Sequence, residues 1–319
     1  MPVPRFVAWS FPALMALSAG AVFGQDFPSK PIRMLTSGVG GDGDLLLRII
    51  LPEISRRFGQ PIIIENRPAG IIPAEIVYKA APDGYTLYTT SASFWIGSLL
   101  QKTPYDVMRD FSPVTLLTQA PAMLVVHPSI PANSVADLIA LAKAKPGVLN
   151  YGSGGTGSTS HMAAEMLNYM AGVNIVRVNY PNGGARMTAG LTNEVQLQFT
   201  SPGLAAPHVK SGKLKGLAVT SIEPTALAPG VPTVAASGVP GYEVVSLTGM
   251  FAPAKTPTAI IARVNQEFVR YINQPDVRQR ILEAGEEVSA GPPEMFRSRL
   301  KAQMSTMGKL INNLGIAAK

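Results

Sequence analysis

Two glycine-rich segments hold the residues of this sequence whose types and spacing best suit chemistry. The first spans residues 37–44 (Ser-Gly-Val-Gly-Gly-Asp-Gly-Asp) and the second spans residues 151–161 (Tyr-Gly-Ser-Gly-Gly-Thr-Gly-Ser-Thr-Ser-His). Each follows a short apolar run and precedes a helical pattern, where free backbone N–H groups and the helix dipole favour an anion. About a hundred residues separate the segments, so a ligand that contacts both must lie between two lobes, which favours capture over catalysis.

The same glycines also fit a nucleotide-binding motif. Both Gly38 to Gly43 and Gly152 to Gly157 match G-x-G-x-x-G, and Glu65 ends an expected strand where a ribose-binding acid belongs. An NAD-dependent oxidoreductase is therefore an alternative. Asp42 argues against it, because this acid intrudes into the turn that would bind the pyrophosphate. Ser158 stands where a Walker A loop requires lysine.

Other kinds of catalytic site find no support in the residue types. The chain has no cysteine, which excludes disulfides, thiolate metal sites and cysteine nucleophiles. No serine lies in a G-x-S-x-G elbow, and His127, His161 and His208 lack the spacing of metal ligands. We therefore expect no catalytic residue, no cofactor and no metal, and we assign His161 chiefly a hydrogen bond at the start of a helix.

The elements that must position these residues follow the order of an α/β protein. Strands are expected near residues 32–36, 61–65, 85–90, 123–127, 149–151, 174–180, 195–199 and 214–220. Helices are expected between most of these strands and at the end of the chain, near 258–273, 275–284 and 293–314. Such alternation predicts parallel sheets with ligands at the carboxyl ends of the strands. Crossovers are expected near residues 105–122 and 222–250.

Polar side chains end several of these strands. Ser91 and Ser93 follow one strand at its carboxyl end, where their hydroxyl groups can reach a ligand, although a helix cap or turn explains them equally well. Tyr180, Thr200 and Ser201 end strands of the second half and are expected to line the same cleft.

The first residues have the pattern of an export signal. Arg5 precedes an apolar run over residues 6–24 that contains small residues suited to cleavage. A membrane anchor is the alternative, but Pro12 interrupts the run, which is short for a span. We therefore expect export to the periplasm with removal of residues 1–24 as a signal peptide.

Size and charge narrow the remaining classes. With 319 residues, of which 46% are hydrophobic and 15% charged, the chain is expected to form about two globular domains. The formal net charge is +7, but lysine and arginine occur singly or in small groups without interleaved aromatic residues. This pattern favours a solvated basic surface over nucleic-acid binding.

Several short motifs resemble one family in the same order along the chain. They include Phe27-Pro28-Ser29-Lys30-Pro31, Glu65-Asn66-Arg67-Pro68, Ala81-Pro82-Asp83-Gly84-Tyr85, Leu149-Asn150-Tyr151 and Phe251-Ala252-Pro253. The family is the Bug family, the solute receptors of tripartite tricarboxylate transporters. The resemblance covers nearly the whole chain after the signal.

The resemblance implies a two-lobed, type II-like periplasmic binding protein that is not an enzyme. Each lobe is expected to be a mostly parallel sheet flanked by helices, with a small carboxylate bound in the cleft between the lobes. Lobe 1 would comprise residues 25–122 and 243–319, and lobe 2 residues 123–242. The expected partners of this monomer are membrane permease subunits, with a sensor kinase as the alternative.

The resemblance also implies that backbone N–H groups of both glycine-rich segments hold the carboxylate. Such a site needs no buried arginine. The candidate ligand-binding residues are Ser37, Gly40, Gly41, Asp44, Ser91, Ser93, Ser153, Gly155, Gly157, Ser158, Thr159, Ser160, His161, Tyr180 and Thr200. Asp42 departs from the family pattern, and an acid beside an anion site leaves a ligand with an amine open.

Overall fold

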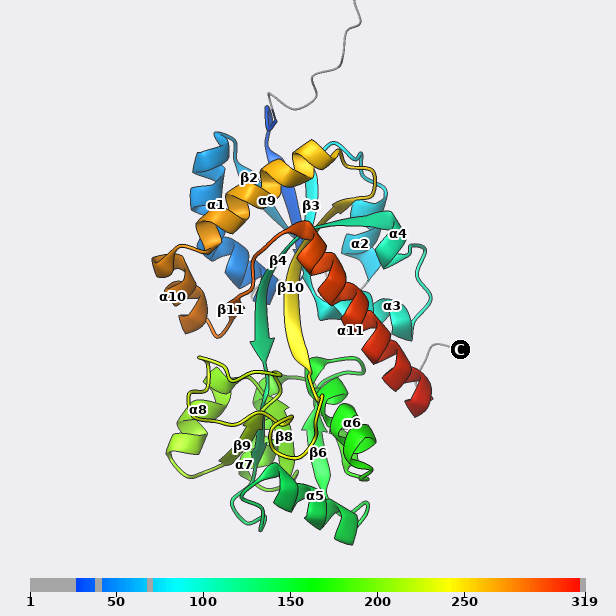
Figure 1. Ribbon diagram of the computed structural model, residues 1–319, viewed down its shortest axis with the longest axis vertical. Coiled ribbons are helices and arrows are strands. Elements are labelled where there is room, and N and C mark those ends of the chain that lie inside the picture. Colours follow the sequence, from blue (N-terminus) through cyan, green and yellow to red (C-terminus); the bar gives the residue numbers. More distant parts are fainter. Residues whose placement is uncertain (1–26, 38–41, 68–70, 316–319) are drawn as a thin grey trace, which may run out of the picture.

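The chain forms two β-sheets, each flanked by helices, that lie one above the other (Figure 1). The computed structural model describes residues 27–37, 42–67 and 71–315. The expected signal peptide and residues 38–41 of the first glycine-rich segment therefore lie outside the described residues. Strands and helices alternate along most of the chain. The expected two-lobed α/β architecture is confirmed.

The first sheet has six strands. In order across the sheet they are β11 (Glu287–Val288), β4 (Phe111–Pro121), β10 (Val245–Pro253), β3 (Thr86–Ser91), β1 (Ile32–Ser37) and β2 (Ile62–Arg67). The strand β1 lies between β2 and β3 and pairs in parallel with both, as βαβ units require. Ile32 and Met34 of β1 are fully buried, so this strand anchors the sheet in the core.

The second sheet has five strands. In order across the sheet they are β7 (Val176–Asn179), β6 (Asn150–Ser153), β8 (Leu197–Thr200), β5 (Met123–Val126) and β9 (Lys215–Val219). The second glycine-rich segment begins in β6, which pairs in parallel with β7 and β8. The carboxyl ends of β6 and β8 therefore lie at the same edge of this sheet.

Both sheets are mixed, which corrects the expectation of mostly parallel sheets. In the first sheet β10 runs antiparallel to β3 and β4, and in the second β5 runs antiparallel to β8 and β9. The connections between the sheets explain this: β4 leads directly into β5, and β10 brings the chain back after β9. The chain thus enters the second sheet through β5 and re-enters the first sheet through β10, and each of these two strands runs antiparallel to both of its neighbours.

Helices cover both sheets. Those around the first sheet are α1 (Asp42–Phe58), α2 (Ile71–Tyr78), α3 (Ala92–Leu100), α4 (Val107–Asp110), α9 (Thr258–Ile272), α10 (Pro275–Glu283) and α11 (Pro293–Leu314). Those around the second sheet are α5 (Val135–Ala144), α6 (Thr159–Ala171), α7 (Gly183–Leu191) and α8 (Pro202–Lys210).

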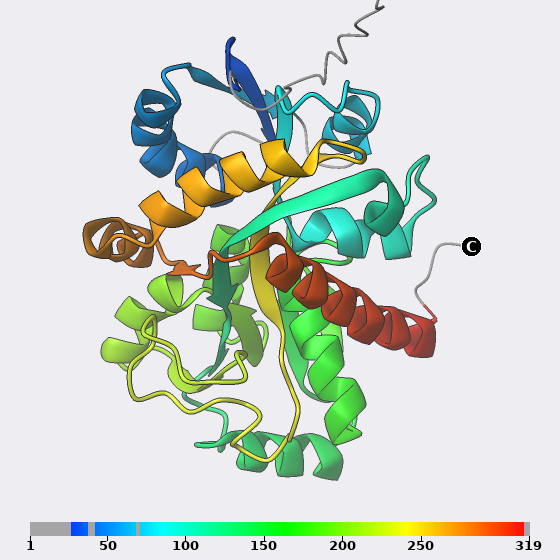
Figure 2. The same ribbon diagram turned by 45° about the horizontal axis from the view of Figure 1, so that its top comes forward.

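Helix α11 ties the two halves together. It contacts β4 and α3 of the first half and α6 of the second, and Figures 1 and 2 show it lying beside α6. The helix approaches β10 closely at Gly249, where an added Cβ would lie 2.1 Å from the ring of Phe296. The absence of a side chain at Gly249 therefore lets Phe296, which is fully buried, fill the space against the sheet.

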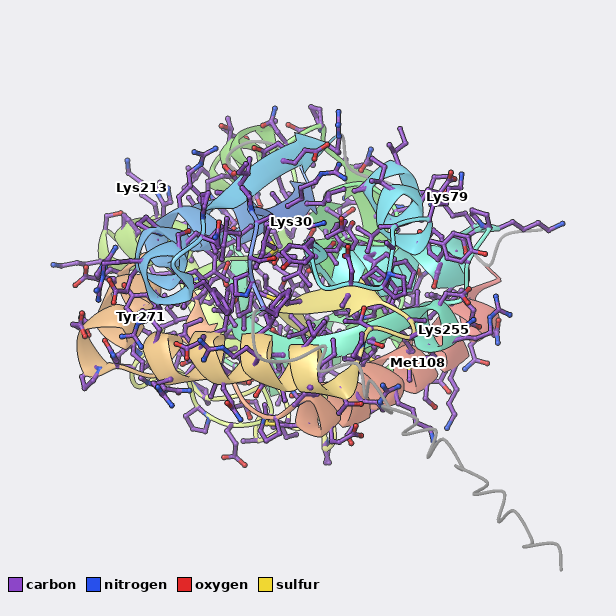
Figure 3. All side chains as sticks on the ribbon, turned by 90° about the horizontal axis from the view of Figure 1, so that it is seen from above. Lys30, Lys79, Met108, Lys213, Lys255 and Tyr271 are labelled. Carbon is purple, nitrogen blue, oxygen red and sulfur yellow. The ribbon has the colours of Figure 1, made fainter. Side chains whose placement is uncertain are left out.

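Basic side chains are distributed over separate parts of the surface. Figure 3 labels Lys30, Lys79, Lys213 and Lys255, which belong to different segments and are all exposed. Within the described ranges, none of the helices is both long enough and apolar enough to span a membrane.

Candidate ligand-binding site

The second glycine-rich segment connects β6 to α6 in a tightly bonded loop. Ser158 caps the helix, since its Oγ accepts a hydrogen bond from the backbone N–H of His161 at 3.3 Å. Gly157 has φ +82°, and a Cβ at this position would lie 2.5 Å from Cδ1 of Leu100. Both the backbone conformation and the space therefore require glycine here.

The loop presents Ser160 at the start of α6. Its Oγ accepts from the backbone N–H of Gly154 at 3.1 Å, accepts from Nη1 of Arg186 at 3.0 Å, and lies 3.2 Å from Oγ of Ser158. These bonds fix two hydroxyl groups and the end of a guanidinium beside the positive end of the helix dipole, an arrangement that suits an anion.

Arg177 holds the loop from the other side. Its Nε donates to Oγ of Ser153 at 2.8 Å, its Nη1 to Oγ1 of Thr156 at 3.1 Å, and its Nη2 to the carbonyl oxygen of Gly154 at 2.8 Å. Because Arg177 binds several points of the loop at once, it fixes the loop conformation. Ser153 is fully buried and therefore supports the loop from beneath.

His161 has the structural role that the sequence favoured. Its Nδ1 accepts a hydrogen bond from the backbone N–H of Gly157 at 3.1 Å, so the neutral ring carries its proton on Nε2. The side chain is buried. Burial, and then the positive charge of Arg177, lower the pKa of the imidazole to about 4. The ring is therefore neutral at physiological pH.

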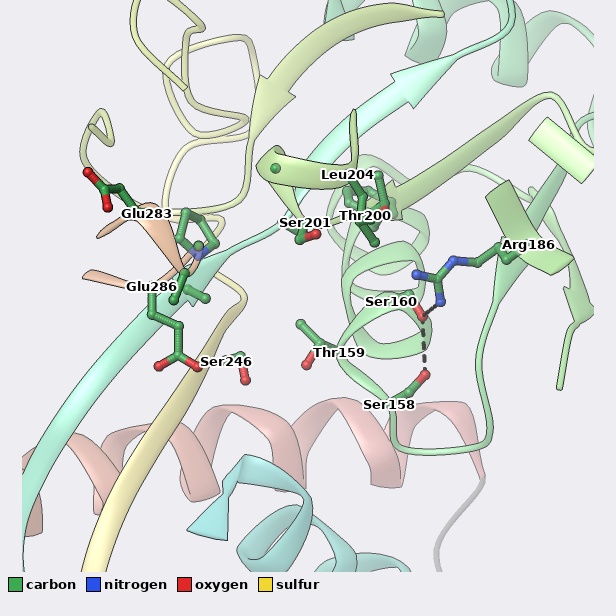
Figure 4. Close-up of a pocket in the computed structure, with 17 residues that line it drawn as sticks. Ser158, Thr159, Ser160, Arg186, Thr200, Ser201, Leu204, Ser246, Glu283 and Glu286 are labelled. Atoms are coloured by element: carbon green, nitrogen blue, oxygen red, sulfur yellow. Dashed lines mark hydrogen bonds between the residues drawn. The ribbon is translucent and has the colours of Figure 1, made fainter. Parts of the chain in front are cut away.

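A cavity of about 630 Å³ lies between the two halves (Figure 4). One wall comes from the start of α6, from α7, and from β8 with the start of α8; the other comes from the ends of β4 and α10 and from β10. The lining residues are Ala120, Pro121, Ala122, Ser158, Thr159, Ser160, Arg186, Phe199, Thr200, Ser201, Gly203, Leu204, Ser246, Glu283, Ala284, Gly285 and Glu286. Its volume is typical of a small-molecule pocket.

Arg186 is a cavity residue with an unsatisfied N–H group and a charge that no carboxylate among the described residues offsets. The side chain is half-buried, and its Nε is buried without a hydrogen-bond partner. Burial lowers the pKa of the guanidinium, and no carboxylate among the described residues offsets that effect. Arginine nevertheless keeps its charge at neutral pH. A buried charge without a counterion is costly, so the arrangement favours an incoming anion.

This finding corrects the expectation of a site without a buried arginine. Arg186 follows the strand β7 on a helix of small residues, and it is the only charged residue between Arg177 and Glu194. A single charged residue in an otherwise uncharged segment was the signal in the sequence that could have identified Arg186. The sequence reasoning also missed Ser246 and the two glutamates of the opposite wall, because they come from segments distant in sequence.

The structure brings five of the expected residues together in the cavity, namely Ser158, Thr159, Ser160, Thr200 and Ser201. Gly155 and Gly157 lie beside a separate space of about 230 Å³ that Gly97 and Leu100 also line.

Other expected residues have structural contacts. Asp44 is buried and accepts from Nε of Arg48 and Nδ2 of Asn66, each at 3.0 Å. The hydroxyl of Tyr180 donates to Glu194 at 2.8 Å. Neither residue lines the cavity, so the part of each in ligand binding stays a prediction.

The remaining expected residues belong to the edge of the first sheet. Ser37 and Ser91 end β1 and β3, and Ser93 lies in the first turn of α3; the side chains of Ser37 and Ser93 lie outside what the structure describes. Gly40 and Gly41 also lie outside the described residues. The contribution of this edge to ligand binding stays a prediction.

The acid expected for a dinucleotide site is engaged elsewhere. Glu65 accepts from Nη2 of Arg33 at 2.8 Å and pairs with Arg67. The hydrogen bond from Arg33 is the main cause that lowers the pKa of this carboxyl group. Glu65 thus has a role on the sheet surface that does not depend on a ribose.

Comparison with known proteins places this geometry among solute receptors. The sequence pattern of the family described as "Tripartite tricarboxylate transporter family receptor" matches residues 46–316. The solved structure of the periplasmic binding protein BugD is 26% identical, with a TM-score of 0.73 over 92% of this chain and 100% of that chain.

Two similar solved structures contain carboxylates. R. palustris Rpa4515 with adipate is 30% identical, with a TM-score of 0.76 over 92% of this chain and 100% of that chain. MatC (Rpa3494) from Rhodopseudomonas palustris with bound malate is 29% identical, with a TM-score of 0.72 over 89% of this chain and 100% of that chain.

Proposed function

Since the chain belongs to the tripartite tricarboxylate transporter receptor family, we propose that it captures a small carboxylate in the cavity between its two sheets. The expectation of a receptor rather than an enzyme is confirmed by the family. The single observation that carries the carboxylate assignment is Arg186, a half-buried guanidinium without a carboxylate partner among the described residues.

The neighbours of Arg186 complete an anion site. Ser160 accepts from Nη1 of Arg186, and because Arg186 lines the cavity, the other N–H groups at the end of its guanidinium can donate to a ligand oxygen. Ser158 and Thr159 begin α6, whose dipole is positive at this end. A carboxylate placed here gains charge-assisted hydrogen bonds, which are roughly twice as strong as those between neutral groups.

Capture requires that both halves contact the ligand. We assign residues 25–122 and 243–319 to one lobe and residues 123–242 to the other, so that the cavity lies between the lobes. Closure would bring the ends of β1 and β3 and the start of α3, with Ser37, Ser91 and Ser93, toward the ligand. The adipate and malate in related structures support a carboxylate as the captured group.

The partner and the compartment follow from the same reasoning. A receptor that is exported with cleavage of residues 1–24 would deliver its ligand in the periplasm to the permease subunits of the transporter. BugD is described as a periplasmic binding protein, which supports this location. A sensor kinase would use the same closed form, and a pulldown with the closed receptor separates the two partners.

The test is a thermal-shift screen of the mature protein with aliphatic, amino-acid and aromatic carboxylates, followed by calorimetry on the compounds that bind. Arg186→Gln should weaken carboxylate binding about ten- to a hundredfold, because a hydrogen bond to a charged group is lost. Arg270→Gln is the matched control, since Arg270 is exposed on α9 far from the cavity lining. Unchanged affinity in Arg186→Gln contradicts the proposal.

The oxidoreductase alternative is tested in the same screen. Because Glu65 already pairs with two arginines, NAD is expected to leave the melting temperature unchanged. A higher melting temperature with NAD, and an unchanged one with every carboxylate, would favour the oxidoreductase over the carboxylate receptor.

A further inference from the structure

Leu204 is a large apolar residue that the fold leaves uncovered. It lies in the first turn of α8, is 55% exposed and lines the cavity. Its helix neighbours Ala205 and Val209, which are about one turn apart, pack in the apolar cluster between α8 and the second sheet, and Leu204 is not part of that cluster. Packing of the core therefore does not explain a leucine at this position.

Apolar residues of the chain that crosses between the sheets border the same part of the cavity. Met123 of β5 lies opposite Thr200 of β8 in an antiparallel pair, so the residues before Met123 continue past the end of β8 toward the start of α8. These are residues 120–122 (Ala-Pro-Ala), and all three line the cavity together with Leu204. Within the facing residues 201–204, only Ser201 has a polar side chain.

There is open space beside Leu204. Its neighbour Gly203 also lines the cavity, and an added Cβ at Gly203 would meet no atom within 4 Å. A hydrocarbon chain in this space would remove apolar surface of Leu204 from water, which favours binding in proportion to the area covered. A polar group in the same place would lose hydrogen bonds to water without regaining them from leucine, proline or alanine side chains.

The apolar part of the cavity lies on the same side as the anion site. Arg186 is the only lysine, arginine or histidine among the lining residues that the structure describes, so it is the position for a carboxylate. Figure 4 shows Thr200 between Leu204 and Ser160, and Ser160 beside the end of Arg186. A ligand anchored at Arg186 can therefore extend along this wall toward Leu204.

We propose that Leu204 is a specificity-determining residue, which selects carboxylates with a hydrocarbon body. The carboxylate is held at Arg186, and the hydrocarbon body lies against Leu204 and residues 120–122. The inference rests on the proposed function, because it uses the same cavity and the same carboxylate site. It adds that apolar contact at α8, in addition to charge at α7, decides which carboxylates bind.

The test uses unbranched monocarboxylates with two to eight carbons, and calorimetry on the mature wild-type protein measures each affinity. The affinity should rise roughly two- to fourfold for each methylene group that reaches Leu204, since each one buries additional apolar surface. An affinity that does not change with chain length overturns the inference. So does a series in which no monocarboxylate binds although a di- or tricarboxylate does.

Variants of Leu204 give a second readout. Leu204→Asn, which is similar in size but polar, should weaken the best monocarboxylate about tenfold and remove the dependence on chain length. The shortest acid that binds the wild-type protein should bind this variant equally well, because it does not reach Leu204. Leu204→Met should keep the dependence on chain length, since methionine restores a flexible apolar side chain. Equal weakening of the shortest and the longest acid in Leu204→Asn would mean a merely structural role and would overturn the inference.

Val148→Asn is the matched control. Val148 is 61% exposed and does not line the cavity, so the same polar replacement there should leave all affinities unchanged.

The two proposals fail in different ways. If Arg186→Gln binds every acid as wild type does, the carboxylate site itself is wrong. If Arg186→Gln loses binding but Leu204→Asn keeps the wild-type dependence on chain length, the role of Leu204 alone is wrong.

Discussion

At the scale of single residues, the proposed binding role of Arg186 comes with a cost in the stability of the ligand-free protein. Its guanidinium is half-buried with an unpartnered Nε, and such a charge destabilises the ligand-free fold. Functional residues commonly carry this kind of cost. Sequence reasoning did not single out Arg186, because its burial and its unpartnered Nε appear only in the folded structure.

We expect Arg186→Gln to raise the stability of the ligand-free protein. Glutamine keeps an N–H donor for Ser160 and removes the uncompensated charge, so the gain should be about 1 kcal/mol, or about 2 °C in Tm for a chain of this size. Differential scanning calorimetry without ligand measures it. A lower Tm than wild type would mean that the charge of Arg186 stabilises the ligand-free fold, which contradicts the role proposed for it.

His161 should make stability depend on pH. Its pKa is lowered from 6.5 to about 4 in the folded protein, so the unfolded chain binds the additional proton between these values. The stabilisation is complete above pH 6.5 and is lost as the pH falls toward 4, with a size on the order of 3 kcal/mol. Denaturant unfolding at pH 7 and pH 4 measures the loss.

The control for this titration is His161→Asn, whose Oδ1 can accept the hydrogen bond from Gly157. Because asparagine does not titrate, the variant should lose less stability than wild type over the same pH range. Equal losses in the two proteins would show that other groups cause the pH dependence.

At the scale of elements, the loop from β6 to α6 positions the anion site. Arg177 fixes Ser153 and Gly154, His161 fixes Gly157, and Gly157 packs against Leu100 of α3. The loop therefore depends on contacts from both halves of the molecule. A change in its backbone should move the start of α6 and the hydroxyl groups of Ser158 and Ser160 with it.

Gly157→Ala tests this dependence. The positive φ and the contact with Leu100 should cost about 1–2 kcal/mol and weaken ligand binding, whereas the larger Gly157→Val should abolish binding in a protein that still folds. Calorimetry and thermal melting measure both effects.

Gly155→Ala is the matched control, because an added Cβ there meets no atom within 4 Å. It should bind and melt as wild type does. Unchanged binding in Gly157→Val would contradict the role assigned to the loop.

At the scale of the whole molecule, polar contacts connect the halves around the cavity. Oε1 of Glu287 in β11 accepts from Oγ1 of Thr225 at 2.6 Å and from the backbone N–H of Ala226 at 2.9 Å. Arg299 of α11 donates to Glu243 at 3.1 Å and so holds the segment that leads back from the second sheet into β10. These few contacts, together with β4 and β10, form a connection about which two lobes can close by a hinge motion.

Ligand binding should therefore make the molecule more compact. Small-angle scattering of the mature protein should show a smaller radius of gyration at saturating ligand, and Tm should rise by roughly 4 °C at a ligand concentration a hundred times Kd. Arg186→Gln at the same ligand concentration should show neither change. Stabilisation without compaction would indicate a ligand held by one half alone.

The sequence by itself determined most of the elements and the class of protein. The last helix was expected at residues 293–314 and is found at Pro293–Leu314. Local periodicity and caps such as Ser134, which accepts from Asp137, are properties of neighbouring residues, so the sequence carries them. The expected crossover at residues 105–122 is found, since the chain passes here from the first sheet to the second, but the sequence did not reveal that this segment contains the strand β4. Its side chains are mostly buried on both faces, so it lacks the alternation that identifies a strand.

Only the tertiary structure decided which residues share the cavity. Arg186, Ser246 and Glu286 come from α7, β10 and the segment after α10, and no local pattern relates positions so far apart. Burial and the absence of a counterion also depend on folded neighbours, because a charge becomes costly only where the surrounding chain excludes water. The sequence therefore indicated an anion-binding receptor through its glycine-rich loops, while only the fold determined which charged residues line the cavity.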